Sequence, residues 1–194
     1  MLFKHRVTRL PEHPICVAGQ SLLSAAAAHG RVNTVARLLK VEEVDINGRG
    51  LADPPICRAA ARGHLDVVGL LVQQGARLKI NEGTIASYDT ALCIAVRDGD
   101  LEMVRVLLLH DQIDVNLTNR WLEDPLILAA KSGHLSIVNE LLCDRRQKGG
   151  SLRRSLDAAR DDCIRRAIRS RIEDRNSRQT FLAPSPRRST GGGL

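Results

Sequence analysis

Apolar and polar positions alternate along this chain in a pattern that occurs four times. Each copy has a short run rich in Ala, Leu or Ile, then a glycine, and then a second run rich in Val and Leu. The separating glycines are Gly30, Gly63, Gly99 and Gly133, so the pattern recurs at a nearly constant interval. Two short apolar runs in each period are typical of paired helices. A period of about 33 residues predicts that these pairs stack into a solenoid, in which each pair covers its neighbours.

The residues before each first run predict where these helices begin. Ser21, Thr90 and Asp124 have side-chain oxygens that can accept the unpaired N–H groups of a first helical turn. Pro125 follows its cap at the first helical position, where a missing N–H costs nothing. The second copy has proline at the cap position itself, so Asp53 would have to serve there. We expect that helix to have the weakest start.

The four copies resemble the ankyrin repeat. The resemblance lies in GHLDVVGLLVQQGA at residues 63–76, GHLSIVNELL at 133–142, VDIN at 44–47 and VN at 115–116. It covers residues 17–143, which would hold four repeats. It implies an all-α solenoid of stacked helix-turn-helix units with short β-hairpin fingers between them. The usual role of the family implies a non-catalytic scaffold or adaptor that binds a protein partner.

The rest of the chain is predicted to close the two ends of this stack. Residues 1–16 are expected to form a partial N-terminal cap, with a frayed terminus as the alternative. Residues 144–173 keep apolar positions at helical spacing and fill many of the others with arginine. We interpret them as a degenerate fifth repeat that forms a basic C-terminal cap. Residues 174–194, rich in Arg, Ser, Pro and Gly, are predicted to be a disordered basic tail.

Composition supports the stack and locates the charge. Aromatic residues make up 2% of the chain, which suits thin layers packed on Ala, Val, Leu and Ile rather than a core built on large rings. The formal net charge is +7, yet residues 144–194 contain 14 basic and 6 acidic residues. The basic excess therefore belongs to the C-terminal quarter, and the rest of the chain is nearly neutral.

Cysteine usage and hydropathy predict the compartment. The five cysteines are scattered without a CxxC pair, and an odd count without a framework indicates a reducing environment. No segment of the sequence reaches the length of apolar residues that a membrane span requires. We therefore expect a cytoplasmic chain, and the arginine clusters would also suit a nuclear one.

The resemblance implies that a partner contacts the fingers and the helix residues just before each turn glycine. In the helices these positions hold Arg62, Arg97, Asp98 and Lys131. In the fingers the candidates are Arg49, Tyr88, Arg120 and Trp121. The two rings are the candidate anchors, because exposed Trp and Tyr dominate binding hot spots. The alternatives are that each ring folds onto the neighbouring finger and that the charged residues are a plain solvated face.

The signs of the charged residues help to distinguish a protein partner from a nucleic acid or an anionic membrane. The candidate face mixes basic and acidic residues, which favours a protein over a nucleic acid, because phosphates call for a patch of one sign. The second hypothesis is that residues 145–188 bind nucleic acid or an anionic membrane. Against it, the stretch RRAIRSRIEDR at residues 165–175 has no aromatic residue for base stacking and contains acids.

Sequence motifs for catalysis and metal binding are missing. The chain contains no GxSxG, HExxH or GxGxxG motif and no Walker-type phosphate loop. Its six histidines lack the companion cysteine or carboxylate spacing of a metal site. We therefore predict that the chain is not an enzyme, uses no cofactor or metal, and is a monomer that binds an unidentified protein.

Overall fold

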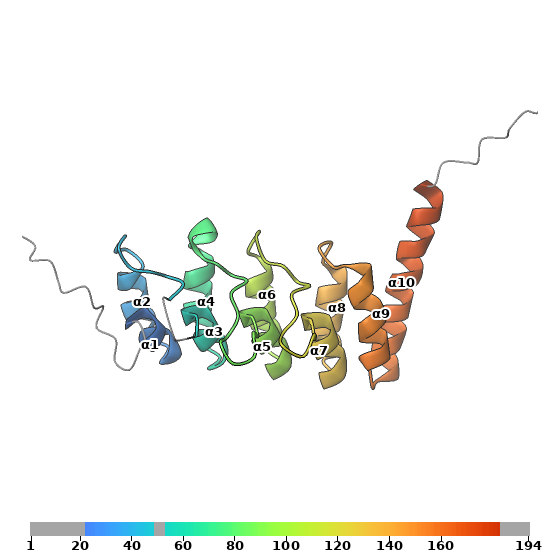
Figure 1. Cartoon of the computed structure of the whole chain (residues 1–194), viewed down its shortest axis with the longest axis horizontal. Helices are drawn as coiled ribbons and strands as arrows, with labels where there is room; N and C mark the ends of the chain where they lie inside the picture. Colours follow the sequence, from blue (N-terminus) through green and yellow to red (C-terminus); the bar gives the residue numbers. More distant parts are fainter. Residues whose placement is uncertain (1–21, 49–52, 183–194) are drawn as a thin grey trace, which may run out of the picture.

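The computed structural model describes residues 22–48 and 53–182, which fold into pairs of helices that follow one another in chain order (Figure 1). The helices of the first four pairs are α1 (Leu22–Ala28), α2 (Val32–Leu38), α3 (Pro55–Ala60), α4 (Leu65–Val72), α5 (Ala91–Asp98), α6 (Leu101–Leu108), α7 (Pro125–Ser132) and α8 (Leu135–Cys143). A short 3-10 helix, η1 (Gly75–Arg77), follows α4. A fifth pair, α9 (Gly149–Ala158) and α10 (Asp162–Leu182), ends the stack.

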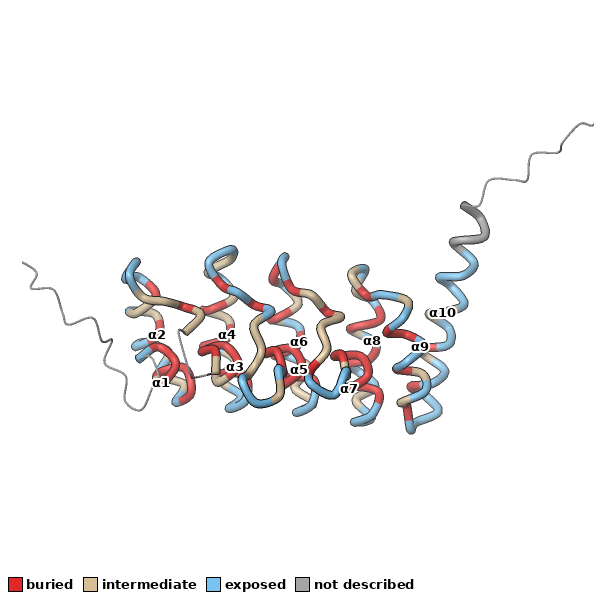
Figure 2. The backbone as a smooth tube through the Cα atoms, viewed as in Figure 1, coloured by how far each residue is buried: buried red, intermediate tan, exposed pale blue. Residues whose placement is uncertain are grey.

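The helices lie in two rows. In the inner row α1 packs on α3, α3 on α5, α5 on α7 and α7 on α9. In the outer row α2 packs on α4, α4 on α6, α6 on α8 and α8 on α10. One core of buried Ala, Val, Leu and Ile side chains runs between the rows, and Figure 2 shows buried backbone along both. The predicted all-α solenoid of helix-turn-helix units is confirmed.

Capping side chains fix two of the inner helices where the sequence predicts them. The hydroxyl of Thr90 accepts a hydrogen bond from a backbone N–H at 3.3 Å at the start of α5, and the Asp124 carboxylate does the same at 3.0 Å in α7. The start of α3 has no side-chain cap, because Asp53 instead accepts a bond from the N–H of Ile85 at 2.9 Å. Ser21 lies outside the described residues.

Histidine rings of one layer pack closely against two of the turn glycines in the layer before. Gly30 and Gly99 have φ values of +63° and +76°, in the left-handed region that glycine tolerates. A Cβ on Gly30 would lie 2.7 Å from a ring atom of His64, and one on Gly99 would lie 2.8 Å from a ring atom of His134. The Nε2 atoms of these histidines contact carbonyl oxygens of the previous layer at 3.2 and 3.4 Å. Glycine therefore leaves room for a contact between layers.

Three asparagines form a second set of links, here called the asparagine ladder: Asn47, Asn81 and Asn116. Each side-chain oxygen accepts a bond from a backbone N–H of the next layer, at 2.7, 2.9 and 2.7 Å. Each side-chain amide donates to a carbonyl oxygen of that same layer, at 3.0, 2.8 and 2.8 Å. The ladder therefore holds the loops of neighbouring layers in register by satisfying backbone groups that no helix or strand satisfies.

The loops between the pairs differ from the predicted fingers. No residue of 22–48 or 53–182 lies in a β-strand, so the short β-hairpin fingers are not seen. Instead, the N–H of Thr84 donates to the carbonyl of Asp89 at 2.9 Å, and the N–H of Asn119 donates to that of Glu123 at 3.0 Å. A second backbone bond closes each loop, from Tyr88 to Thr84 and from Leu122 to Asn119, and the two bonds in each loop do not form a strand ladder.

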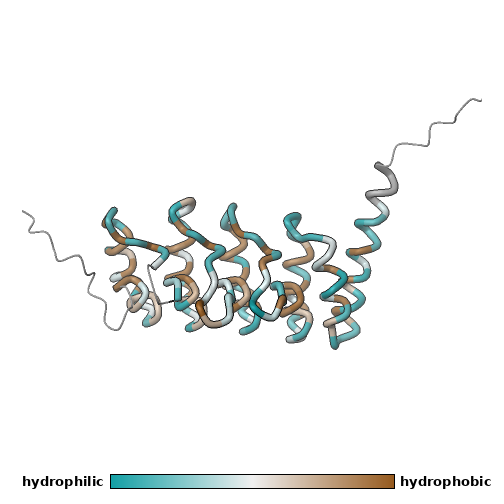
Figure 3. The backbone as a smooth tube through the Cα atoms, viewed as in Figure 1, coloured by the Kyte–Doolittle hydropathy of each residue, from teal (hydrophilic) through white to brown (hydrophobic). Residues whose placement is uncertain are grey.

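The C-terminal pair closes the stack with one apolar side. Ile164 and Ile168 of α10 are buried, while Arg165 and Arg166 between them are exposed. The projecting part of α10 is largely hydrophilic in Figure 3, as an end layer requires. Helix α10 continues to Leu182, so residues 174–182 are helical where the tail was predicted to begin. The reason is local: no proline or glycine lies between Asp162 and Pro184.

Two predictions fall on segments beyond this description. The partial cap at residues 1–16 and the tail at residues 183–194 both lie outside the described residues. Among the helices that are described, none combines the length and the apolar character that crossing a membrane would require.

Candidate functional site

Two neighbouring loops carry the most unusual surface of the molecule. Residues 84–89 precede α5 and residues 119–123 precede α7, and Figure 2 shows exposed backbone in both. The N–H of Arg120 donates to the carbonyl of Ser87 at 2.9 Å, and the Arg120 guanidinium donates to the carbonyl of Ala86 at 2.7 Å. These bonds join the second loop to the first, so the two loops present one continuous surface.

A buried carboxylate organises the first loop. Asp89 is fully enclosed, and its Oδ1 accepts a hydrogen bond at 3.1 Å from the side chain of Asn119 in the next loop. The guanidinium of Arg97, at the end of α5, lies 2.7 Å from the same oxygen, and the Ser87 hydroxyl donates to the other. A buried charge is costly unless it is paired and hydrogen-bonded, and Asp89 is both. The loop is therefore held by α5 and by its neighbour.

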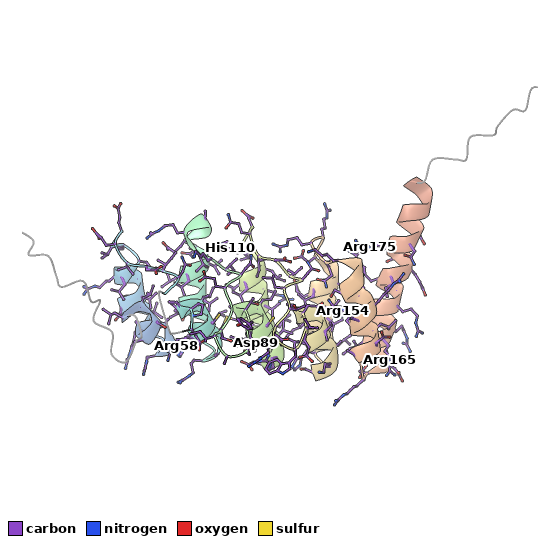
Figure 4. All side chains as sticks on the ribbon, in the orientation of Figure 1. Arg58, Asp89, His110, Arg154, Arg165 and Arg175 are labelled. Atoms are coloured by element: carbon purple, nitrogen blue, oxygen red, sulfur yellow. The ribbon has the colours of Figure 1, made fainter. Side chains whose placement is uncertain are left out.

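Asp124 has the corresponding role one layer on. It caps α7 and forms an ion pair with Arg154 of α9 at 3.1 Å, although it is completely buried. Burial raises the pKa of the Asp124 carboxyl, and the cap bonds and the charge of Arg154 offset part of that effect. Arg154 also donates to the carbonyl of Leu122 at 3.2 Å. Figure 4 labels Asp89, just before α5, and Arg154, on α9, with the α7/α8 pair between them.

Four apolar side chains stand out from these loops, and we call them the tip patch: Ile85, Tyr88, Trp121 and Leu122. All four are exposed, so neither predicted anchor ring is buried under its neighbour. Single exposed apolar residues are common, whereas a group on adjacent, mutually bonded loops indicates an interaction surface.

The backbone beneath the tip patch is strained. Tyr88 has φ of +56° and Leu122 has φ of +61°, at equivalent positions of the two loops. The left-handed conformation costs an L-residue about 1–2 kcal/mol, and glycine would avoid this cost. Burial does not offset it, because Tyr88 is 63% exposed and Leu122 is 70% exposed. These are positions at which the fold alone favours glycine.

The charged residues predicted for the site divide into two groups. Arg97, Arg120 and Lys131 make contacts within the chain, to Asp89, a loop carbonyl and Glu123 respectively. They help to build the surface and also form part of it, since each remains exposed. Arg62 and Asp98 are exposed at the ends of α3 and α5. Arg49 lies outside the described residues.

Sequence reasoning missed three residues of the site. Ile85 and Leu122 complete the tip patch, and the available signal was an apolar residue in the same loop as Tyr88 or next to Trp121. Arg154 joins the site from α9 through Asp124, which belongs to the layer before. No local pattern in the arginine-rich region distinguishes Arg154 from its neighbours.

The described residues include no candidate metal site. Across residues 22–48 and 53–182, no three His, Cys, Asp or Glu side chains come together in a way that could hold an ion. The surface consists of an apolar patch, exposed cations, carboxylates paired with them and the exposed Asp98, which is suited to binding.

Comparison with known protein families gives a match over most of the stacked helix pairs. A family model described as ankyrin repeats in three copies matches residues 56–150. That range begins in α3 and ends in α9, and it includes both loops of the tip patch. A search of curated proteins finds no match.

Proposed function

Residues 56–150 belong to the ankyrin-repeat family, whose members generally mediate protein–protein interaction, and from that premise we propose a non-catalytic module that binds a protein through the tip patch and the inner helices. The observation that carries the proposal is the pair of strained loop residues, Tyr88 and Leu122. A strained backbone persists where the surrounding structure enforces it, and such sites cluster at binding surfaces. Here the strain positions large apolar side chains in solvent.

The inner row of helices extends this surface. Its helices pack against the outer row, so their exposed residues lie on the opposite side, which we call the inner face. Arg62, Arg97, Asp98 and Lys131 are exposed there, next to the loops. The ion pairs of Arg97 with Asp89 and of Lys131 with Glu123 reduce the ordering cost of binding, because a rigid surface loses little freedom when a partner docks.

The arginine-rich end is the weaker candidate. Its helix α10 exposes Arg166 and Arg169, but acids are interspersed along the same helix, and Arg165 is paired with Asp162 at 3.1 Å. A phosphate backbone favours a surface of one sign, and this helix has mixed charge. We therefore favour the tip patch over α10 as the working surface.

The proposal is tested with three forms of the full-length chain as bait in native cell extract. They are the unaltered chain, the double variant Trp121→Ala/Leu122→Gly, and Leu109→Ala as a matched control. Leu109 is an exposed apolar residue that follows α6 in the outer row, away from the loops. Captured proteins are identified by mass spectrometry, and the thermal melting of each form is recorded.

We expect the double variant to lose a partner that both other forms retain. Truncating a hot-spot residue costs about 2 kcal/mol or more, which is about 30-fold in affinity. The double variant should melt at the same temperature as the unaltered chain or slightly higher, because both altered side chains are largely exposed and glycine at position 122 relieves the left-handed strain. Equal capture by all three folded forms would refute the tip patch as the binding surface.

A further inference from the structure

A cavity of about 300 Å³ lies between α9 and α10, which run side by side at the end of the stack in Figure 1. Its lining includes two arginines, Arg153 from α9 and Arg175 from α10, and no acidic residue. The volume is at the lower end of the range for ligand pockets, which suits a small group better than a long segment. The cavity shares no residue with the tip patch, so it is a separate feature of the surface.

Arg175 is held in place across the gap between the two helices. Its Nη1 donates a hydrogen bond at 2.9 Å to the carbonyl of Gln147, just before α9, and Figure 4 labels Arg175 on the part of α10 beside α9. A Cβ on Gly149 would lie 3.8 Å from the Nε of Arg175, so the guanidinium lies against the start of α9. A guanidinium has five N–H donors, so those not bonded to Gln147 are left for a ligand.

The charge of the two arginines is not cancelled within the described part of the chain. Arg153 is exposed and forms no hydrogen bond or ion pair with a described residue, and Arg175 forms no ion pair with one. The acids closest in sequence are Asp157 on α9 and Glu173 and Asp174 on α10, and none of them lines the cavity. The cavity therefore presents two positive charges without a neutralising carboxylate.

The rest of the lining leaves room beside these charges. Gly149 and Gly150 contribute no side chain, and a Cβ on Gly150 would meet no atom within 4 Å. Leu152, which is buried, and Ile172, which is half-buried, form an apolar wall. Two guanidinium groups match a doubly charged anion, and a phosphate monoester carries a charge of about −1.5 to −2 at pH 7. Its oxygens also suit the paired N–H donors of arginine.

We propose that the cavity between α9 and α10 binds a doubly charged phosphate group. Arg153 and Arg175 donate hydrogen bonds to the phosphate oxygens, and Leu152 and Ile172 contact the carbon group of an ester. The same chemistry is offered by a phosphate ester and by inorganic phosphate, and the apolar wall favours the ester. This site goes beyond the proposed function and does not depend on it, because the tip patch takes no part in it.

The test is a titration of the ¹⁵N-labelled full-length chain followed by amide chemical shifts in NMR spectra. The probes are phenyl phosphate, inorganic phosphate and phenyl sulfate, which has the same ring but a single negative charge. Four proteins are compared: the unaltered chain, Arg153→Gln, Arg175→Gln, and Arg166→Gln as a control that removes one exposed charge from α10 outside the cavity. Arg153→Gln breaks no bond to a described residue, so the fold should persist even if Arg175→Gln disturbs it.

We expect phenyl phosphate to shift the amide signals of the lining residues, Gly149 and Gly150 among them, and inorganic phosphate to shift the same signals at higher concentration. Equal binding of the two would still support a phosphate site and would identify free phosphate as its ligand. Arg153→Gln should weaken binding by about three- to ten-fold, between the effects of losing an exposed ion pair and a charged hydrogen bond. Unshifted lining residues, phenyl sulfate bound as tightly as phenyl phosphate, or Arg153→Gln behaving like Arg166→Gln would each overturn the inference.

Discussion

A matched pair of glycine substitutions tests how the layers are joined. Gly63 and Gly99 occupy equivalent turns with φ of +69° and +76°, so alanine suffers similar backbone strain at both. Their surroundings differ, because a Cβ on Gly63 meets nothing within 4 Å, whereas one on Gly99 meets the His134 ring at 2.8 Å. The difference between the two substitutions therefore isolates the contact between layers.

The expected magnitudes follow from these two terms. Left-handed strain costs alanine about 1–2 kcal/mol, and the reduced entropy of the unfolded chain returns about 0.4–1 kcal/mol. Gly63→Ala should thus lower the free energy of unfolding by about 1 kcal/mol or slightly less. Gly99→Ala should cost about 1–3 kcal/mol more, which is the usual penalty for overpacking a close contact.

Urea denaturation followed by far-ultraviolet circular dichroism measures both costs, and His134→Ala completes a double-mutant cycle with Gly99→Ala. In the His134→Ala background, the cost of Gly99→Ala should fall to that of Gly63→Ala. Equal costs for the two alanines in the unaltered chain, or a Gly99→Ala cost that His134→Ala leaves unchanged, would refute the reasoning about the histidine contact.

Three other properties can be predicted from side-chain environments. Asp124→Ala should lower the free energy of unfolding by about 1–2 kcal/mol in denaturation, because it removes the side-chain cap of α7 and leaves the half-exposed Arg154 to solvent, whereas Asp124→Asn should cost less by keeping the cap. The hydrogen bond from Arg146 lowers the pKa of Asp144 below its ordinary value of 3.8. The ionised carboxylate therefore stabilises the fold at pH values above 3.8, and that contribution is lost as the pH falls below this value. Asp144→Asn should lessen the loss of melting temperature in acid. Burial raises the pKa of Cys57 and raises that of Cys93 to about 11, so both thiols should resist iodoacetamide at neutral pH in the folded chain until denaturant is added. Among the four cysteines that the structure describes, those that should react are the exposed Cys143 and Cys163.

Local and periodic features of the fold could be predicted from sequence. The glycine period indicated the first four helix pairs, and Thr90 and Asp124 marked the starts of α5 and α7, because a cap acts within its own turn. The β-hairpin fingers came from the family resemblance, whereas this chain closes its loops with a few backbone hydrogen bonds and no strand ladder. Asn81 was overlooked although it continues the spacing from Asn47 to Asn116, since its neighbours do not match the family phrase.

The candidate site was harder to predict because it depends on contacts between layers. Trp121 and Tyr88 were identified by residue type and loop position, and both are exposed. Sequence spacing alone did not reveal that Arg97 lies on Asp89 or that Arg154 reaches a cap residue of the previous layer. The backbone strain at Tyr88 and Leu122 is also invisible in a string of residue types, because it appears only when the loops are in place.

One residue of the asparagine ladder, Asn47, is prone to deamidation. Asn47 precedes Gly48, and in this dipeptide the following backbone nitrogen attacks the side-chain amide most readily, releasing ammonia. The aspartate that forms on hydrolysis keeps an acceptor for the N–H of Lys79 but loses the donor that bonds the carbonyl of Arg77. Deamidation would therefore loosen the first link between layers and leave those at Asn81 and Asn116 in place, so old protein should open from its N-terminal end.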